Sequence, residues 1–273
     1  MLRRLCWVLS LGVVVCGLSG SAFAAFGTQD WWQDVQFGGS GIVGDSSQMV
    51  YDQFNVGSGT VRLALMAHGR YGQSPVSAVA PGIYYVETGK YGGTGYDKDY
   101  AKWNFGFYVA APNVNQYLGV KLFYDFDPGE NTGTLNYAWF IANFSSINDD
   151  GDPDSVKGEV ENSWNLAMNF LSTGSTLYSN GVPIGGVVKS QSNSFNPNVN
   201  GEYTFKLEVF QVTAQYDDHN NLTGFSWGNS LGSIEMKVNA VPEPATLVGL
   251  ASLGATGLGA VVLRRRKKAR SRH

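Results

Sequence analysis

The most chemically suggestive stretch of this 273-residue sequence is a run of acidic residues near its middle. Three aspartates stand at alternate positions and a glutamate follows eleven residues after the first, which matches four acidic positions of a twelve-residue calcium loop. These residues are Asp150, Asp152, Asp154 and Glu161. Such a loop needs glycine at its sixth position, where this chain has Ser155. The stretch predicts either a calcium site or, as the missing glycine favours, a solvated acidic loop that caps a helix.

A second pair of carboxylates, Asp125 and Asp127, lies at the end of a predicted strand. Alternate positions on a strand face the same side, so the two groups can share a metal ion or act as an acid and a base. The sequence offers no partner for either role, and an aspartate before Pro-Gly is typical of a turn. Turn chemistry is therefore the favoured interpretation.

Nucleophilic catalysis has few candidate residues in this chain. Both cysteines, Cys6 and Cys16, lie in an N-terminal apolar run, and only His68 and His219 lie between residues 25 and 240. The sequence contains neither a G-x-S-x-G nor an H-E-x-x-H motif. We therefore expect no enzymatic activity and no required cofactor. The remaining enzymatic alternative is a polysaccharide hydrolase that uses two carboxylates far apart in the sequence.

Tyrosines in a glycine-rich segment are the candidate ligand contacts. Tyr91, Tyr96 and Tyr100 lie in the stretch 90–100, whose composition predicts a loop. Exposed rings can stack on the flat faces of sugars. With the acidic loop, these tyrosines suggest a carbohydrate-binding module that calcium assists.

The first 24 residues have the three parts of a cleavable secretory signal. Arg3 and Arg4 precede an apolar run over 5–18, and Ala22-Phe-Ala24 provides a small-residue cleavage site. The run is short for a membrane span. We expect signal peptidase to remove residues 1–24, so that the mature chain begins near Ala25.

The C-terminal segment combines a proline-flanked acid, an uncharged stretch and a basic tail. It begins with Val241, Pro242, Glu243 and Pro244. Residues 245–263 carry no charge and are numerous enough for a transmembrane helix, which needs about 20 residues. The positive-inside bias predicts that the tail, 264–273, stays in the cytoplasm and the body lies outside. The basic cluster of this tail is Arg264, Arg265, Arg266, Lys267 and Lys268.

This order of features resembles the PEP-CTERM sorting signal of Gram-negative bacteria over about residues 241–270. The resemblance implies processing by an exosortase, a membrane-embedded cysteine transpeptidase that cuts near the Pro-Glu-Pro motif. The same tail is also labelled an ice-binding protein C-terminal domain, which implies nothing about ice. Residues 124–128, 162–166 and 201–205 are similar to other PEP-CTERM substrates. PEP-CTERM proteins tend to be associated with exopolysaccharide production, so the resemblance implies a role at the cell surface or in the biofilm matrix.

The charge of the body differs sharply from that of the whole chain. Residues 25–240 carry ten Lys and Arg against 21 Asp and Glu, a net charge of −11, whereas the whole chain has −3. Nucleic-acid binding depends on basic side chains that neutralise phosphates. The charge balance therefore excludes nucleic acid as a partner. The candidate partner is extracellular polysaccharide, which the PEP-CTERM resemblance implies.

Apolar residues in the body alternate with a period of two, which is typical of half-buried strands. Such strands predict an all-β fold, an antiparallel, jelly-roll-like β-sandwich in one domain, 25–240, followed by one C-terminal transmembrane helix. The alternating sets run over 61–65, 103–109, 118–126, 135–141, 164–170, 203–209 and 234–238.

One short helix is expected in the acidic stretch. Asp152 and Pro153 suit its N-cap and first position, and Val156 with Val160 gives the i, i+4 spacing of a buried stripe. The helix is expected to end before a strand that begins at Trp164.

Two sorting signals around a body without a catalytic constellation favour a non-enzymatic surface or matrix protein, associated with exopolysaccharide or biofilm. Its precursor is expected in the inner membrane of a Gram-negative bacterium. A carbohydrate-binding module is the alternative, and a polysaccharide hydrolase is the less favoured third hypothesis.

Overall fold

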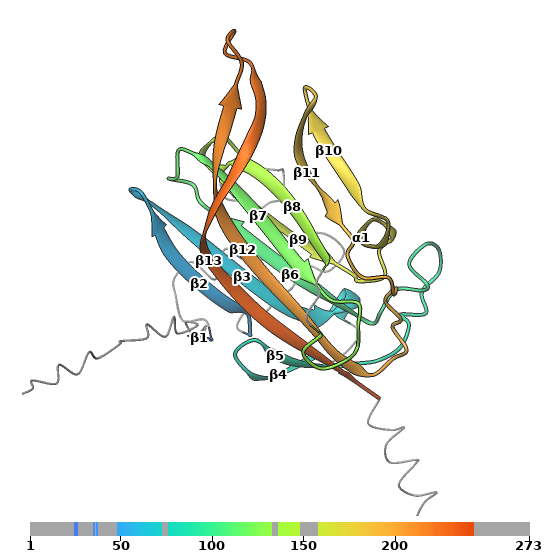
Figure 1. Cartoon of the computed structure of the whole chain (residues 1–273). Helices are drawn as coiled ribbons and strands as arrows, with labels where there is room; N and C mark the ends of the chain where they lie inside the picture. Colours follow the sequence, from blue (N-terminus) through green and yellow to red (C-terminus); the bar gives the residue numbers. More distant parts are fainter. Residues whose placement is uncertain are drawn as a thin grey trace, which may run out of the picture.

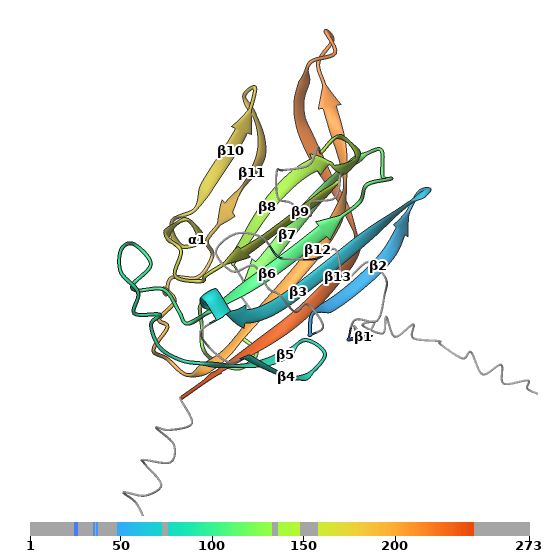
Figure 2. The ribbon, with the colours of Figure 1, turned by 180° about the vertical axis from the view of Figure 1, so that it is seen from behind.

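The computed structural model describes residues 25–26, 35, 37, 48–72, 76–132, 136–147 and 158–242, which form two β-sheets (Figure 1, Figure 2). The all-β fold class predicted from the sequence is confirmed. The predicted signal peptide, the predicted span 245–263 and the basic tail lie outside the described residues. Within the described ranges, no helix is long and apolar enough to cross a membrane.

The smaller sheet has five strands in the order β1-β2-β3-β6-β9, and all neighbours are antiparallel. β2 and β3 form a hairpin whose two-residue turn holds Gly57 at a φ of 60°, a conformation that favours glycine. The strands are β1 (Ala25–Phe26), β2 (Val50–Val56), β3 (Gly59–Gly69), β6 (Trp103–Ala110) and β9 (Glu159–Trp164).

The larger sheet has eight strands in the order β10-β11-β8-β7-β12-β13-β5-β4. β13 runs parallel to β5, so the sheet is mixed rather than purely antiparallel as predicted. The alternation of apolar residues shows which side chains share a face, but it carries no information about the direction of the neighbouring strand. The strands are β4 (Val76–Ala80), β5 (Ile83–Glu87), β7 (Tyr117–Tyr124), β8 (Asn136–Asn143), β10 (Ser175–Ser179), β11 (Val182–Val188), β12 (Gly201–Tyr216) and β13 (Leu222–Val241).

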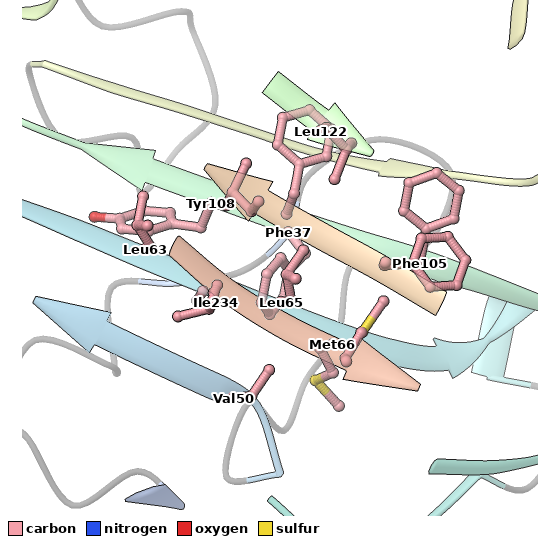
Figure 3. Close-up of a cluster of buried hydrophobic side chains, with 14 of the residues drawn as sticks. Phe37, Val50, Leu63, Leu65, Met66, Phe105, Tyr108, Leu122 and Ile234 are labelled. Carbon is pink, nitrogen blue, oxygen red and sulfur yellow. The ribbon is translucent and has the colours of Figure 1, made fainter. Parts of the chain in front are cut away.

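Aromatic and branched side chains from the facing sides of the two sheets fill the core. Phe105 of β6 and Phe205 of β12 have ring centroids 4.6 Å apart, and Trp103 meets Phe205 edge to face at 6.2 Å. The two sheets therefore pack against each other as in a sandwich. The alternating set of β12 predicted from the sequence is confirmed as buried: Tyr203, Phe205, Leu207 and Val209. Figure 3 shows part of this cluster, including Leu63, Leu65, Leu122 and Ile234.

The side of the five-stranded sheet that faces away from this core is also buried around β6, since all eight residues of β6 are buried. Phe37 lies against Gly106, where a Cβ would stand 2.7 Å from the phenyl carbons. Only glycine leaves room for this ring. The Phe37 N–H donates to Glu161 Oε2 at 3.2 Å, so Phe37 covers this part of the second face of the sheet.

Two local predictions near residue 160 are wrong. Val160 lies in β9 and pairs with Val109, so the predicted helix does not extend to it. β9 ends at Trp164, and α1 (Asn169–Thr173) occupies part of the predicted strand 164–170. The Asn165 side chain ends β9, because its Oδ1 accepts the N–H of Ala101 at 3.1 Å and its amide donates to neighbouring backbone carbonyls. The predicted helix start at 152–153 lies outside the described residues.

Substitution of one buried and one exposed leucine tests which part of the eight-stranded sheet stabilises the fold. Leu207 is fully buried between the sheets, whereas Leu177 of β10 is 62% exposed. We expect Leu207→Ala to lower the free energy of unfolding by about 2–5 kcal/mol, because it removes buried methyl groups and leaves a cavity. The matched variant Leu177→Ala is expected to change it by no more than about 0.5 kcal/mol. Denaturant unfolding measures both, and equal losses would contradict the assignment of the core.

Candidate functional site

The outer side of the eight-stranded sheet, which faces away from the core, carries a row of partly exposed aromatic side chains. In β7 and β8 the pairing of Phe123 with Tyr137 and of Lys121 with Trp139 places these residues opposite the buried Leu122 and Ala138. β12 and β13 add two more rings. We call this set the aromatic strip; it consists of Phe123, Tyr137, Trp139, Phe210 and Trp227.

Contacts between the rings fix the aromatic strip. Trp227 meets Trp139 with centroids 5.8 Å apart and Phe210 with centroids 5.6 Å apart, both edge to face. Phe123 and Tyr137 have centroids 5.4 Å apart. Edge-to-face and tilted arrangements are those that aromatic pairs prefer, so the rings hold each other in place. A fixed row of rings loses little conformational entropy when a ligand binds.

Two residues of β7, Gly119 and Lys121, contact the rings of the aromatic strip. The ring of Trp227 lies over Gly119, where a Cβ would stand 2.4 Å from its Cζ3, so a larger residue there would displace the indole. The Lys121 ammonium lies 4.6 Å from the centroid of Trp227, 4.9 Å from Phe210 and 5.1 Å from Tyr137. Each of these distances is within the range of a cation–π interaction. Lys121 thus holds three rings of the strip together.

A cleft of about 1080 Å³ adjoins the aromatic strip. Two hairpins, β10–β11 and β12–β13, project beyond the rest of the sandwich (Figure 1) and supply residues at their tips. Tyr117, Ile141 and Phe225 supply apolar surface between them. The remaining lining residues are Ala142, Asn143, Ser146, Ile147, Ser179, Asn180, Val182, Ile184, Asn220, Asn221 and Leu222.

The cleft and the strip share one side of the sheet. Tyr117, Gly119, Lys121 and Phe123 are alternate residues of β7 and therefore face the same way. Ile141 of the cleft pairs with Gly119, over which Trp227 of the strip lies. The two features thus form one continuous surface of aromatic rings, asparagine amides and hydroxyl groups.

The cleft is lined by neutral side chains. Among the described residues, its lining contains no carboxylate, imidazole, amine or guanidinium group. Glycoside hydrolysis needs two carboxyl groups on either side of the scissile bond, and proton transfer needs a group that titrates near neutral pH. The surface offers instead the apolar rings and amides that hold a polar, flat ligand.

The alternation of apolar residues in the sequence does not predict this surface. It predicts Tyr137, Trp139 and Ile141 as one side of a half-buried strand, whereas Tyr137 and Trp139 face outward and Asn136 and Ala138 face the core. β8 has apolar residues on both sides, so alternation alone does not choose between them. Lys121, which lies among apolar residues and pairs with Trp139, is the one signal that marked the outer side.

The predicted ligand tyrosines lie elsewhere, around a buried arginine. The Arg70 guanidinium is 4.7 Å from the ring centroid of Tyr71, 5.6 Å from Tyr91 and 4.9 Å from Tyr100. Its Nη2 donates to Asp97 Oδ2 at 3.1 Å. The structure thus brings Tyr91 and Tyr100 together in a cage for Arg70, where they have a structural task.

Tyr96, the third predicted tyrosine, differs from the other two. It is 81% exposed and forms an edge-to-face pair with Tyr100, with centroids 6.2 Å apart. A ligand role for the three tyrosines stays a prediction, and Tyr96 is the most exposed of the three.

A buried polar cluster lies beside this cage. The Nδ1–H of His68 donates to the Gly69 carbonyl at 3.2 Å, and its Nε2 accepts the Ser163 hydroxyl at 2.8 Å. Asn104 donates to the same hydroxyl oxygen at 3.1 Å. Burial, with a smaller effect of the Arg70 charge, lowers the pKa of His68 from 6.5 to about 4, so the imidazole is neutral at pH 7.

The acidic pair Asp125 and Asp127 makes the contacts of a turn. Asp125 Oδ1 accepts the N–H of Asp127 at 2.8 Å, and Asp127 Oδ1 accepts the N–H of Gly129 at 2.9 Å. The hydroxyl of Thr132 donates to the other oxygen of Asp125. These interactions agree with the favoured interpretation from the sequence, in which the two carboxylates stabilise a turn.

Only one of the four residues of the predicted calcium site is described by the structure. Asp150, Asp152 and Asp154 lie outside the described residues, whereas Glu161 is buried on β9. Among the residues that the structure describes, no group of three His, Cys, Asp or Glu side chains is placed to hold a metal ion. Calcium binding by the acidic loop stays a prediction.

Comparison with known proteins gives one match. Residues 240–267 match the family model described as the PEP-CTERM protein-sorting motif. The chain carries a PEP-CTERM sorting motif. The motif implies an exported protein that is sorted to the cell envelope and processed by an exosortase, as the resemblance in the sequence indicated. Neither the curated proteins nor the solved structures include a match to this chain.

The PEP-CTERM motif begins where the described sheet ends. β13 finishes at Val241, whose carbonyl accepts the N–H of Thr88 at 2.9 Å and its hydroxyl at 3.3 Å. Pro242 follows and has no N–H with which to continue a ladder. The motif is therefore joined to the folded body without a spacer. Glu243, Pro244 and the basic tail lie outside the described residues.

The lowered pKa of His68 predicts a specific dependence of stability on pH. The unfolded chain takes up a proton on this residue below about pH 6.5, whereas the folded chain does so only near pH 4. Its contribution to stability is therefore complete above pH 6.5 and is lost as the pH falls to about 4, by up to about 3 kcal/mol.

Unfolding measured from pH 7 to pH 4 tests this effect. His68→Gln is expected to remove that part of the pH dependence, whereas His219→Gln, in an exposed hairpin turn, is expected to leave it unchanged. Parallel pH curves for the wild type and His68→Gln would contradict the assignment.

Proposed function

We propose that this protein is a non-catalytic component of the cell surface or the biofilm matrix, which associates with exopolysaccharide through the aromatic strip. The observation that carries the proposal is a row of fixed, partly exposed rings beside a cleft whose described lining has no carboxylate, on an exported protein. Aromatic rings present a flat apolar surface to the C–H faces of sugars, as they do to other flat ligands. The acidic charge of the body directs the choice of partner away from nucleic acid.

The proposed route to the surface has three steps. Signal peptidase removes residues 1–24, and the uncharged stretch 245–263 then holds the precursor in the inner membrane of a Gram-negative cell. The basic tail stays in the cytoplasm under the positive-inside bias, which places the body outside. The exosortase, implied by the PEP-CTERM motif, then cuts near Pro242 and Pro244.

The absence of enzymatic activity is part of the proposal. Its support is the lining of the cleft, where asparagines and serines stand in place of the paired carboxylates of a glycoside hydrolase. The contrary outcome is also measurable: release of new reducing ends from the producing cells' own polysaccharide would show a hydrolase.

Intact mass spectrometry tests the proposed processing. In cells with an active exosortase, the mature chain is expected to start near Ala25 and to lack the basic tail. Replacement of Pro242, Glu243 and Pro244 by alanine is expected to leave the C-terminal segment attached and the protein in the membrane fraction. A variant with alanine in place of the exposed Glu130 and Asp218 serves as the control. A wild-type chain that still ends at His273 in such cells would refute this step.

A polysaccharide array, probed with the protein in the presence and absence of calcium, tests the aromatic strip. We expect Trp139→Ala to weaken binding about 2- to 10-fold, because a stacked aromatic contact contributes about 0.5–1.5 kcal/mol. Tyr85→Ala, at a ring that is 42% exposed on β5, is the control and is expected to bind as the wild type does. Tyr96→Ala separates the two candidate sites: a larger loss there than at Trp139 would favour the loop tyrosines. A loss of binding with a calcium chelator would support the acidic loop as a calcium site.

A further inference from the structure

The residues that line the cleft between the hairpins indicate whether its ligand is charged. The inference drawn from them rests on the proposed function. Four asparagines line the cleft, together with two serines. Each amide has two donor hydrogens and an accepting oxygen, and so matches the adjacent hydroxyl groups of a sugar ring without any charge. The asparagines are Asn143 from β8, Asn180 from the β10–β11 turn, and Asn220 and Asn221 from the β12–β13 turn.

Hydrogen bonds orient two of these amides before any ligand binds. Asp217 Oδ1 accepts the backbone N–H groups of His219 at 2.9 Å and Asn221 at 2.8 Å, and Asp217 Oδ2 accepts the side-chain amide of Asn221 at 3.0 Å. On the other side of the cleft, the hydroxyl of Ser145 donates to Asn143 Oδ1 at 2.8 Å. The side chains of Asn221 and Asn143 are thus held in place by hydrogen bonds, which lowers the entropy cost of binding.

A ring pair separates the amides from the aromatic strip. Tyr117 of β7 and Phe225 of β13 have centroids 5.0 Å apart and both line the cleft. From Tyr117 to Phe123, β7 extends over six residue steps, about 20 Å at roughly 3.3 Å per residue. The continuous surface is therefore much longer than one sugar ring, and it fits a segment inside a polysaccharide chain.

The charge around this surface disfavours a polyanion. The body carries a net charge of −11, and the described lining of the cleft contributes no cation to offset it. Lys206 is paired with Glu208 at 2.9 Å. Lys121 has no carboxylate within 4.0 Å among the described residues, but its ammonium already lies over three rings. A chain of uronic acids or sulfated sugars would meet long-range repulsion that these two groups do not compensate.

We propose that this surface binds an uncharged polysaccharide along the interior of its chain. One segment lies in the cleft, where the asparagine amides hydrogen-bond its hydroxyl groups. The next sugars pass Tyr117 and Phe225 and stack on Trp227 and Trp139. Affinity therefore grows with chain length, and it does not depend on salt.

Binding of the full-length chain in a detergent without a sugar headgroup tests this proposal. The probes are neutral glucan, mannan and galactan, with their oligosaccharides from disaccharide to hexasaccharide, and polygalacturonate as the polyanion. We expect at least one neutral polymer to bind, with a Kd that falls as its oligosaccharides lengthen and changes less than twofold between low and high salt. Polygalacturonate is expected not to bind.

Variants then separate the two parts of the surface. Asn143→Ala is expected to weaken binding of short and long oligosaccharides alike, about tenfold, because it removes contacts in the cleft. Trp139→Ala is expected to leave the shortest ligand unaffected and to abolish the gain with length. Tyr85→Ala, outside the surface, is the control, and unchanged unfolding shows that each variant is folded.

The outcomes distinguish the inference from the proposed function. Salt-sensitive binding of polygalacturonate without binding of any neutral polymer would overturn the uncharged ligand and leave polysaccharide association in place. An affinity that does not change with chain length would overturn the proposal that further sugars stack along the aromatic strip. Binding of no polysaccharide at all would overturn the proposed function together with this inference.

Discussion

The antiparallel pairing of β12 with β13 is the interaction on which the other features depend. These strands have 16 and 20 residues and form the longest pairing in the described sheets. The half of the hairpin nearer to Gly201 and Val241 supplies Phe205 and Ile234 to the core. The half nearer to its turn supplies Trp227 to the aromatic strip and several lining residues to the cleft. One hairpin therefore contributes to the core, the strip and the cleft.

The outer sides of the two sheets are used in different ways. On the five-stranded sheet, Phe37 covers Gly106, and a buried polar cluster around His68 and Arg70 fills the neighbouring space. On the eight-stranded sheet, the outward rings of β7 and β8 stay partly exposed. A group of partly exposed rings that contact one another is the kind of apolar patch that marks an interaction surface. The contrast supports the choice of this side as the binding surface.

The sequence predicted the fold class and the buried side of β12 because alternation with a period of two is a local property of the chain. It did not predict the parallel pairing of β5 with β13, which depends on contacts between residues some 150 positions apart. The aromatic strip was missed for a related reason, since β8 has apolar residues on both sides and only its neighbours decide which side is buried. The tyrosines after Lys90 were found as a group, but their association with Arg70 is a tertiary contact that spacing does not show.

The length of β13 has a consequence for where the surface stands relative to the PEP-CTERM motif. The strand starts at Leu222, which lines the cleft, and it ends at Val241, where the PEP-CTERM motif begins. Twenty residues of strand extend up to about 60 Å at roughly 3.3 Å per residue. The cleft therefore lies at the opposite end of β13 from the junction with the PEP-CTERM motif. The proposed glycan-binding surface and the proposed exosortase cut are thus separated by the length of one strand.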